Sequence, residues 1–432
     1  MAVPPSREAG GKRTKLRRLT ALFEVQDAAT ARWLPMEGLR GFAVALVFLV
    51  HYASFLDDRS DADWLGALHE VGNVGVDLFF VLSGFLIYKA CIQRPINFRL
   101  YAYRRVERIY PAFLAALSIY LALMLLMPGT SKLPEGLGAQ ISYVLANVLL
   151  LPGMLPIEPM MTVAWSLSYE AFYYLPVPLA IVFLRMRQWT PPQRLVFFLA
   201  LYAAMIAVEL AGLGGRFRLS TFLGGMMLYE IISMIPAERR RTSALSDATS
   251  LAVVGGAFTL YVLLAINPVA VPSALNGALP PVTRIVIINI AFVLLVYRSV
   301  FTCGPAARAF SWTPLRWLGN MSYSFYLMHG LGLHALFMLL GKLGLLQAVG
   351  FGIFLLWLPA GIVASFAMSL PIYLLIERPL SLKSAIKHPA VKTADDTPAK
   401  SAKSAAKNNP ANSPARAGAP AARLPAASQR LR

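Results

Sequence analysis

Long hydrophobic runs alternate with short polar segments along most of the chain. Most of the runs approach the ~20 residues that an α-helix needs to cross about 30 Å of hydrocarbon. Because the bilayer core holds no water for backbone polar groups, runs of this length predict membrane-spanning helices. The ten predicted spans are Gly38–Leu56, Val71–Cys91, Ile109–Met127, Leu167–Phe183, Leu195–Leu213, Leu219–Ile235, Leu251–Ile266, Val282–Tyr297, Leu318–Leu340 and Ala348–Ile376.

Two hydrophobic runs depart from the simple pattern. Ile141–Leu151 is too short to span, and Pro152 and Pro156 end it, so we predict a re-entrant or interfacial segment. Ala348–Ile376 is longer than one span requires. We therefore expect that last run to be tilted in the membrane, or kinked at one of its prolines.

The composition excludes an ordinary soluble protein. Of 432 residues, 57% are hydrophobic and only 14% are charged, whereas a soluble domain carries about 25% charged residues. The two cysteines, Cys91 and Cys303, lack metal-ligand spacing, so neither a disulfide framework nor a metal site is expected. We therefore predict an all-α polytopic membrane protein of about ten transmembrane helices.

The net charge of +19 comes from bases in the tails and in the loops between the hydrophobic runs. If the basic N-terminus is cytoplasmic, the first outer loop, residues 57–63, is acidic and the next inner loop, residues 92–108, is rich in arginine. This is the positive-inside distribution of membrane proteins. It predicts that both termini are cytoplasmic, that the chain lies in the cell (inner) membrane, and that nucleic acid is not a partner.

These patterns divide the chain into three parts. Residues 1–34 form a basic cytoplasmic segment, and the hydrophobic run that follows is typical of a retained helix rather than of a cleaved signal peptide. Residues 35–380 form the transmembrane domain. Residues 381–432 are rich in Ala, Lys and Pro, so we expect a disordered cytoplasmic tail in contact with anionic membrane lipid.

An ionisable side chain inside hydrocarbon is costly and marks a candidate functional site. Arg40 and His51 belong to the first predicted helix. Their spacing puts both on nearly one face, with a rise of roughly 16 Å between them. Arg40 would lie at the cytoplasmic mouth and His51 deeper. The alternative is an interfacial arginine anchor and a histidine satisfied by a neighbouring helix, but the shared face favours a function.

Asp77 and Glu170 are the carboxylates that we expect near His51. Asp77 enters the second predicted helix from the outer side to a depth comparable with His51, and Glu170 lies near the outer start of the fourth. A histidine beside a carboxylate can act as a general base whose tautomer is fixed by its partner. We therefore take all three as candidate catalytic residues. In the alternative interpretation, Asp77 caps its helix and Glu170 faces water.

Five further residues are candidates for substrate binding. Arg105 and Arg108, three apart before the third predicted span, share a helical face and could clamp a phosphate together with Arg40, although positive-inside charge also explains them. Ser83 lies among glycines that would leave room for an acyl-pantetheine arm or for close helix packing. No nucleophile motif surrounds Ser83. His329 is a second buried histidine, for which packing is the simpler role.

Several short motifs occur in a fixed order between residues 35 and 380, and each would be weak alone. They are Leu39–Gly41 with His51, Gly75–Phe85, Arg104–Pro111, Trp165–Glu170, Ser322–His329 and Glu377–Pro379. In this order the chain resembles the acyltransferase-3 family of bacterial membrane acyltransferases.

The resemblance implies ten helices and transfer of acetyl or a similar short acyl group to an acceptor outside the membrane. By position, Arg40 and His51 match the family's arginine–histidine motif, and Arg105 and Arg108 match its paired arginines. Glu170 departs from the pattern, because the family often has two acidic residues there.

We therefore predict an acyltransferase that uses acyl-CoA, with acetyl-CoA the favoured donor, as co-substrate and has no tightly bound cofactor. The expected acceptor is a hydroxyl of a carbohydrate or glycolipid. His51 would either take the proton of that hydroxyl or receive the acyl group itself. The alternative function is a transporter or flippase of an anionic or lipid-linked glycan, and a signalling or scaffold protein ranks last.

Overall fold

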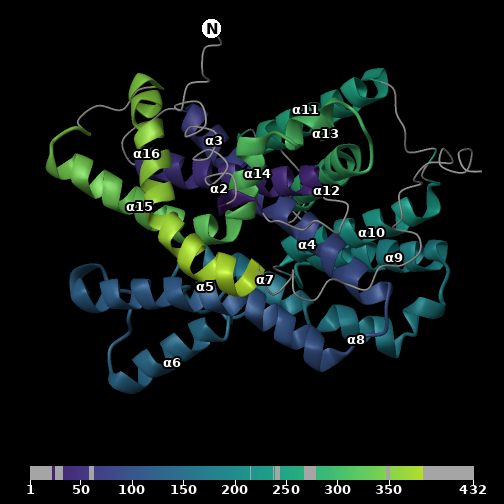
Figure 1. The fold of residues 1–432 in the computed structure, drawn as a ribbon, viewed down its shortest axis with the longest axis horizontal. Coiled ribbons are helices and arrows are strands. Elements are labelled where there is room, and N and C mark those ends of the chain that lie inside the picture. Colours follow the sequence, from purple (N-terminus) through teal and green to yellow (C-terminus); the bar gives the residue numbers. More distant parts are fainter. Residues whose placement is uncertain are drawn as a thin grey trace, which may run out of the picture. The chain divides into compact units, whose positions relative to one another are not determined.

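The computed structural model describes residues 22–24, 33–57, 63–214, 216–236, 238, 244–266, 279–346 and 351–382. Every regular element within these ranges is helical, which confirms the all-α fold (Figure 1). The predicted N-terminal segment 1–34 and tail 381–432 lie almost wholly outside the described residues. The orientation of the termini therefore stays a prediction.

The α-helices of the described ranges follow one another in sequence order. They are α2 (Leu34–Asp57), α3 (Asp63–Asn73), α4 (Gly75–Ile92), α5 (Phe98–Leu126), α6 (Leu137–Val148), α7 (Ala164–Tyr173), α8 (Pro176–Phe183), α9 (Pro191–Leu210), α10 (Ser220–Met234), α11 (Ala244–Ile266), α12 (Leu279–Val300), α13 (Pro305–Phe310), α14 (Thr313–Asn320), α15 (Ser322–Lys342) and α16 (Phe351–Ile372). A π-helical stretch, η5 (Tyr373–Leu382), continues α16, and a short turn, η3 (Phe217–Leu219), precedes α10.

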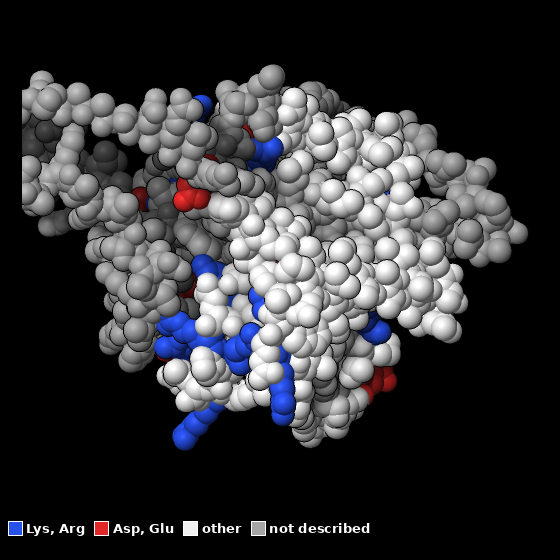
Figure 2. All heavy atoms as spheres, turned by 90° about the vertical axis from the view of Figure 1, so that its right-hand side faces the viewer, with Lys and Arg blue, Asp and Glu red and all other residues white. Residues whose placement is uncertain are grey.

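Eight helical segments in the described ranges are long and apolar enough to cross a bilayer. Each overlaps one of the ten predicted spans. They are Leu34–Leu56, Leu65–Ile92, Phe98–Leu126, Pro191–Leu210, Asp247–Ala265, Pro281–Val300, Ser322–Lys342 and Phe354–Ser381. The chain is therefore a multi-pass membrane protein. Figure 2 shows one face on which arginine and lysine side chains gather beside a broad uncharged surface.

The other two predicted spans are helical but shorter. Leu167–Phe183 is divided between α7, of 10 residues, and α8, of 8 residues. Pro176 begins α8, and because proline has no backbone N–H it cannot donate a helical hydrogen bond to the preceding turn. α10 has 15 residues. The run predicted to be interfacial forms α6, of 12 residues, whose Leu137, Ile141 and Leu145 are exposed.

The last predicted span stays helical through both of its prolines. Pro359 and Pro371 lie inside α16, and the chain then widens into the π-helical stretch η5. π-helical turns are rare and occur often at functional sites. Here the stretch carries Glu377, whose side chain is buried.

Close helix crossings surround α2, which packs against α3, α4, α14 and α15. A Cβ atom at Gly41 would lie 2.0 Å from the carbonyl oxygen of Leu315, and one at Gly319 would lie 1.7 Å from that of Glu37. Only glycine fits at such contacts. Figure 1 shows α15 and α16 on one side of α2, and the pair α4 and α10 on the other side. α2 is therefore packed between these two groups of helices.

Candidate active site

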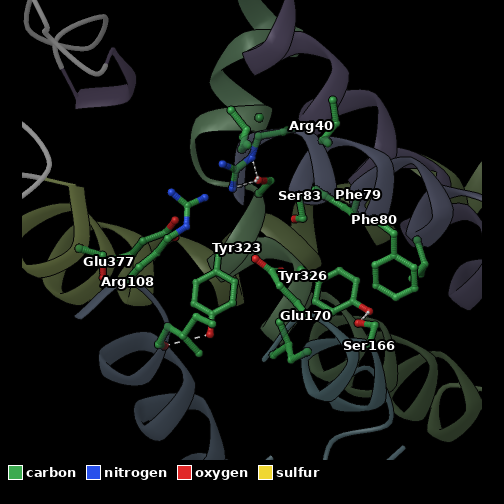
Figure 3. Close-up of a pocket in the computed structure, with 18 of the residues that line it drawn as sticks. Arg40, Phe79, Phe80, Ser83, Arg108, Ser166, Glu170, Tyr323, Tyr326 and Glu377 are labelled. Carbon is green, nitrogen blue, oxygen red and sulfur yellow. Dashed lines mark hydrogen bonds between the residues drawn. The ribbon is translucent and has the colours of Figure 1, made fainter. Parts of the chain in front are cut away.

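Seven helical elements enclose one cavity, with a volume of about 120 Å³. Its wall combines charged, hydroxyl and aromatic side chains from α2, α4, α5, α7, α14, α15 and η5 (Figure 3). The lining residues are Arg40, Val76, Phe79, Phe80, Leu82, Ser83, Leu86, Arg108, Ile109, Ser166, Leu167, Glu170, Gly319, Asn320, Ser322, Tyr323, Tyr326, Glu377 and Ser381. Three of the predicted binding residues, Arg40, Ser83 and Arg108, are among them.

Arg40 reaches the cavity from α2 and is anchored to the first residue of α15. Its Nε and Nη2 atoms donate to Ser322 Oγ at 3.3 Å and 3.2 Å. Figure 3 shows this guanidinium at the cavity wall, with its two hydrogen bonds to Ser322 as dashed lines. A guanidinium held in this way can bind an anion with little further loss of side-chain freedom.

Two carboxylates face the two arginines in this cavity. Glu377 accepts a hydrogen bond from the backbone N–H of Ser324 at 3.0 Å and another from the Ser324 hydroxyl. Both acidic groups, Glu170 and Glu377, act electrostatically on Arg40, as does Arg108 from α5. The cavity wall is therefore a mixed cationic and anionic surface in which each charge has an opposite neighbour.

Glu170 lies in the second half of α7 rather than beside His51. Its Oε1 atom accepts a hydrogen bond from the Tyr174 hydroxyl at 2.5 Å. The structure therefore corrects the prediction that Glu170 orients His51, because the Glu170 carboxylate is bound to Tyr174 on a cavity wall that does not include His51. The prediction assumed one long span from Leu167 to Phe183, but α7 is short and ends before Pro176, so the position of Glu170 along that span was not a guide to its neighbours. The membrane side on which Glu170 lies stays a prediction.

Asp77 is bound to Arg218, which also corrects its predicted pairing with His51. Nε of Arg218 donates to Oδ1 and Nη2 to Oδ2, each at 2.8 Å. Arg218 also donates to the Asn73 carbonyl oxygen at 2.6 Å and lies over the Trp165 ring. Burial alone would lower the pKa of Arg218, but the charge of Asp77 and its hydrogen bonds raise that pKa above its ordinary value.

His51 does not line the cavity and instead faces His329. The centres of the two imidazole rings are 5.1 Å apart. His329 is fully buried, and its Nδ1 atom lies 3.0 Å from the Phe325 carbonyl oxygen and 2.9 Å from that of Tyr326. The structure thus brings the two predicted histidines together, but neither of them lines the cavity on which Arg40 and Arg108 lie.

Arg105 is also placed away from the cavity wall. Its guanidinium lies between two tyrosine rings, 5.1 Å from the centre of Tyr101 and 4.9 Å from that of Tyr174. A stacked guanidinium of this kind gains cation–π stabilisation. Of the predicted arginine pair, Arg108 alone therefore has its side chain on the cavity.

Several wall residues were quoted in sequence motifs but were given no role. Tyr326 and Ser166 form a hydroxyl pair at 2.6 Å, and Tyr323 donates to the Ile109 carbonyl oxygen at 2.9 Å. Ser322 and Tyr326 are four residues apart on α15, which puts their two polar groups on one stripe of the helix. That spacing is a usable sequence signal. Glu377 gave no such signal, because it follows the last predicted span.

The sequence of the chain is similar to those of known proteins. The sequence model of a family described as acyltransferase domain matches residues 35–374. The O-acetyltransferase OatA of Staphylococcus aureus (strain NCTC 8325 / PS 47) is 27% identical over 323 residues, 69% of this chain and 50% of OatA. The exopolysaccharide production protein ExoZ of Rhizobium meliloti (strain 1021) is 25% identical over 327 residues, 74% of this chain and 92% of ExoZ.

The chain therefore spans about half the length of the OatA proteins that it matches. No solved structure is significantly similar to it. The family match includes α2 to α15 and all but the end of the last span. Most of the cavity wall, and both histidines, fall inside the matched residues.

Proposed function

Because the chain belongs to the acyltransferase-3 family, we propose that it transfers an acyl group, in the favoured case acetyl, from cytoplasmic acyl-CoA to a hydroxyl of a cell-surface carbohydrate or glycolipid. The names of two relatives, an O-acetyltransferase and an exopolysaccharide production protein, support this reaction and this class of acceptor. The proposed location is the inner cell membrane.

The observation that carries the proposal is the cavity wall with Arg40 and Arg108 on it, next to the α2–α15 contact that holds His51. Guanidinium groups are suited to phosphate oxygens, which they bind through charge-assisted hydrogen bonds. Arg108 is exposed and belongs to the arginine-rich N-terminal part of α5. We assign Arg40 and Arg108 to the phosphates of the donor and Ser83 to the wall along its acyl-pantetheine arm.

His51 is the proposed base. One imidazole nitrogen takes the proton of the acceptor hydroxyl while the hydroxyl oxygen forms a bond to the acyl carbonyl carbon. The carbon–sulfur bond then breaks, and the CoA sulfur takes up the proton held by His51 and leaves as a thiol, which returns His51 to its neutral form. In the covalent variant, the same nitrogen first bonds to the acyl carbon, the carbon–sulfur bond breaks, and the sulfur takes up the proton of the other ring nitrogen and leaves as a thiol. The acceptor hydroxyl then attacks the acyl carbon, the carbon–nitrogen bond breaks, and the ring regains a proton from the hydroxyl.

The test uses everted membrane vesicles from cells that make the full chain, supplied with acetyl-CoA labelled in the acetyl group. We expect thiol release together with alkali-labile label in the carbohydrate fraction. His51→Ala should lower both by at least about 100-fold, the contribution expected of a general base. Vesicles from cells that lack the protein give the baseline.

Label transfer that is unchanged by His51→Ala, in a variant that reaches the membrane in normal amounts, would refute the role of His51. Vesicles that move a labelled glycan but release no thiol from acetyl-CoA would instead identify a transporter or flippase. These two results are separable because thiol release reports the bond that breaks, whereas glycan movement does not.

A further inference from the structure

His329 has one ring nitrogen without a partner in a fully buried position. Its Nδ1 atom lies at hydrogen-bond distance from two backbone carbonyl oxygens, and a carbonyl oxygen can only accept. Nδ1 therefore carries the proton, which leaves Nε2 as an acceptor. Among the described residues, Nε2 has no hydrogen-bond partner. A buried acceptor without a partner is costly and calls for an explanation.

The imidazole of His51 is placed to supply that partner. The two ring centres are 5.1 Å apart. Two imidazoles joined by an N–H···N bond of about 2.9 Å have ring centres about 5 Å apart. A half-turn of the His51 ring about its Cβ–Cγ bond exchanges nitrogen and carbon positions and leaves the ring almost in place, and this torsion has two broad minima. An N–H of His51 is therefore within reach of His329 Nε2.

The surroundings hold the His329 ring in one orientation. The Phe325 ring stacks on it, with centres 5.7 Å apart and planes 4° from parallel. Ser365 on α16 donates to the backbone carbonyl oxygen of His329 at 3.3 Å. With Nδ1 bound to its own helix as well, the direction of Nε2 is fixed before any substrate arrives.

The histidine contact repeats the arginine contact along the same two helices. Arg40 on α2 meets Ser322 on α15, and His51 on α2 meets His329 on α15. Ser322 and Tyr326 line the cavity, and His329 lies one turn beyond Tyr326 on the same stripe of α15. The two helices therefore hold the base and its partner in register with the cavity wall.

We propose that His329 is the positioning residue for His51. Nε2 of His329 accepts a hydrogen bond from one nitrogen of His51 and so keeps the other nitrogen unprotonated and directed at the acceptor hydroxyl. The same bond stabilises the imidazolium that forms when His51 takes the proton. A neutral partner suits this place, because a carboxylate there would add a charge to the membrane interior. The proposal rests on the proposed function, in which His51 is the base.

Three variants of the full chain separate positioning from packing. His329→Phe keeps an aromatic ring and removes the acceptor. His329→Gln places an amide oxygen near the position of Nε2, and His329→Asn places its amide near the position of Nδ1. Each is purified in detergent, checked by size exclusion and thermal unfolding, and assayed for kcat and for KM toward acetyl-CoA.

Loss of the partner that orients a metal-bound imidazole typically costs about 10–100-fold, and we take the same range for the partner of His51. We expect His329→Phe to lower kcat by about that factor with KM for acetyl-CoA within twofold, and His329→Gln to recover most of the loss. The kcat of His329→Asn should remain close to the lowered kcat of His329→Phe. If His329→Phe fails to fold, the other two variants give the test by themselves: we expect a higher kcat for His329→Gln than for His329→Asn.

Equal kcat in the Gln and Asn variants, or an effect confined to KM, would overturn the positioning role. Unchanged kcat in His329→Phe would overturn it as well. These outcomes differ from failure of the proposed function, since in that case the unmodified chain itself would release no thiol from acetyl-CoA.

Discussion

At the scale of single residues, the cavity balances its charges. Arg40 and Arg108 share its wall with Glu170 and Glu377, so an anionic donor must compete with two carboxylates for the guanidinium groups. Arg40 is anchored by Ser322, whereas Arg108 is exposed to solvent on the cavity side. Substitution of Arg108 therefore tests the phosphate site most directly, because no hydrogen bond within the described part of the protein is lost with its side chain.

Arg108→Ala should weaken the binding of acyl-CoA with little effect on kcat. A hydrogen bond to a charged group is worth about 1.5–3 kcal/mol, which corresponds to roughly a 10- to 150-fold rise in KM for acetyl-CoA. The matched control is Arg104→Ala, one turn earlier on the same helix, which removes an equal charge from an exposed position off the cavity. Equal effects in the two variants would show a general effect of charge instead of a phosphate site.

At the scale of helices, the crossing of α4 and α10 shapes one side of the cavity. A Cβ atom at Gly225 would lie 2.0 Å from the Val81 carbonyl oxygen, and one at Gly84 would lie 2.1 Å from that of Phe222. The two helices are therefore in backbone contact, and α4 is presented with Ser83 toward the cavity. The Asp77–Arg218 ion pair joins the start of α4 to the turn before α10.

Gly225→Ala should destabilise the protein by about 1–3 kcal/mol, because an added methyl group forces the two backbones apart. Gly256→Ala on α11 is the control, since a Cβ atom there would meet nothing within 4 Å. That change should be neutral or stabilising by up to about 1 kcal/mol, since alanine favours a helix more than glycine does. Thermal unfolding in detergent measures both, and equal melting temperatures would contradict the close crossing.

At the scale of the whole chain, α5 tests the predicted orientation. This helix is 29 residues long and has Arg104 near one end and Glu135 beyond the other, both exposed. If the arginine-rich end is cytoplasmic, Arg104→Cys reacts with a membrane-impermeant maleimide only in everted vesicles, and Glu135→Cys only in right-side-out vesicles. Both are made with Cys303→Ser, which removes the exposed native thiol. The reverse pattern would invert the orientation.

The sequence by itself determined the helical fold, its place in a membrane and the family. Hydrophobic length decides whether a segment spans a bilayer, and this is a local property. Eight of the ten spans predicted on this basis are, in the described part of the chain, helices long and apolar enough to cross a bilayer, and the run predicted not to span forms the shorter helix α6. The two shortened spans show the limit of the rule, because Pro176 interrupts one hydrophobic run without lowering its hydrophobicity. The spacing of Arg40 and His51 likewise predicted that both lie on nearly one face of their helix.

Only the tertiary structure decided which charges meet. Asp77 was matched to His51 by depth alone, but Arg218, 141 residues away, takes both of its oxygens. Glu377 reaches the cavity through a π-helical stretch that no hydrophobic period predicts. The partner of a buried charge depends on which helices are neighbours and how they are rotated, and neither property is encoded within one helix. The meeting of His51 with His329 was decided in the same way, by the packing of α2 against α15.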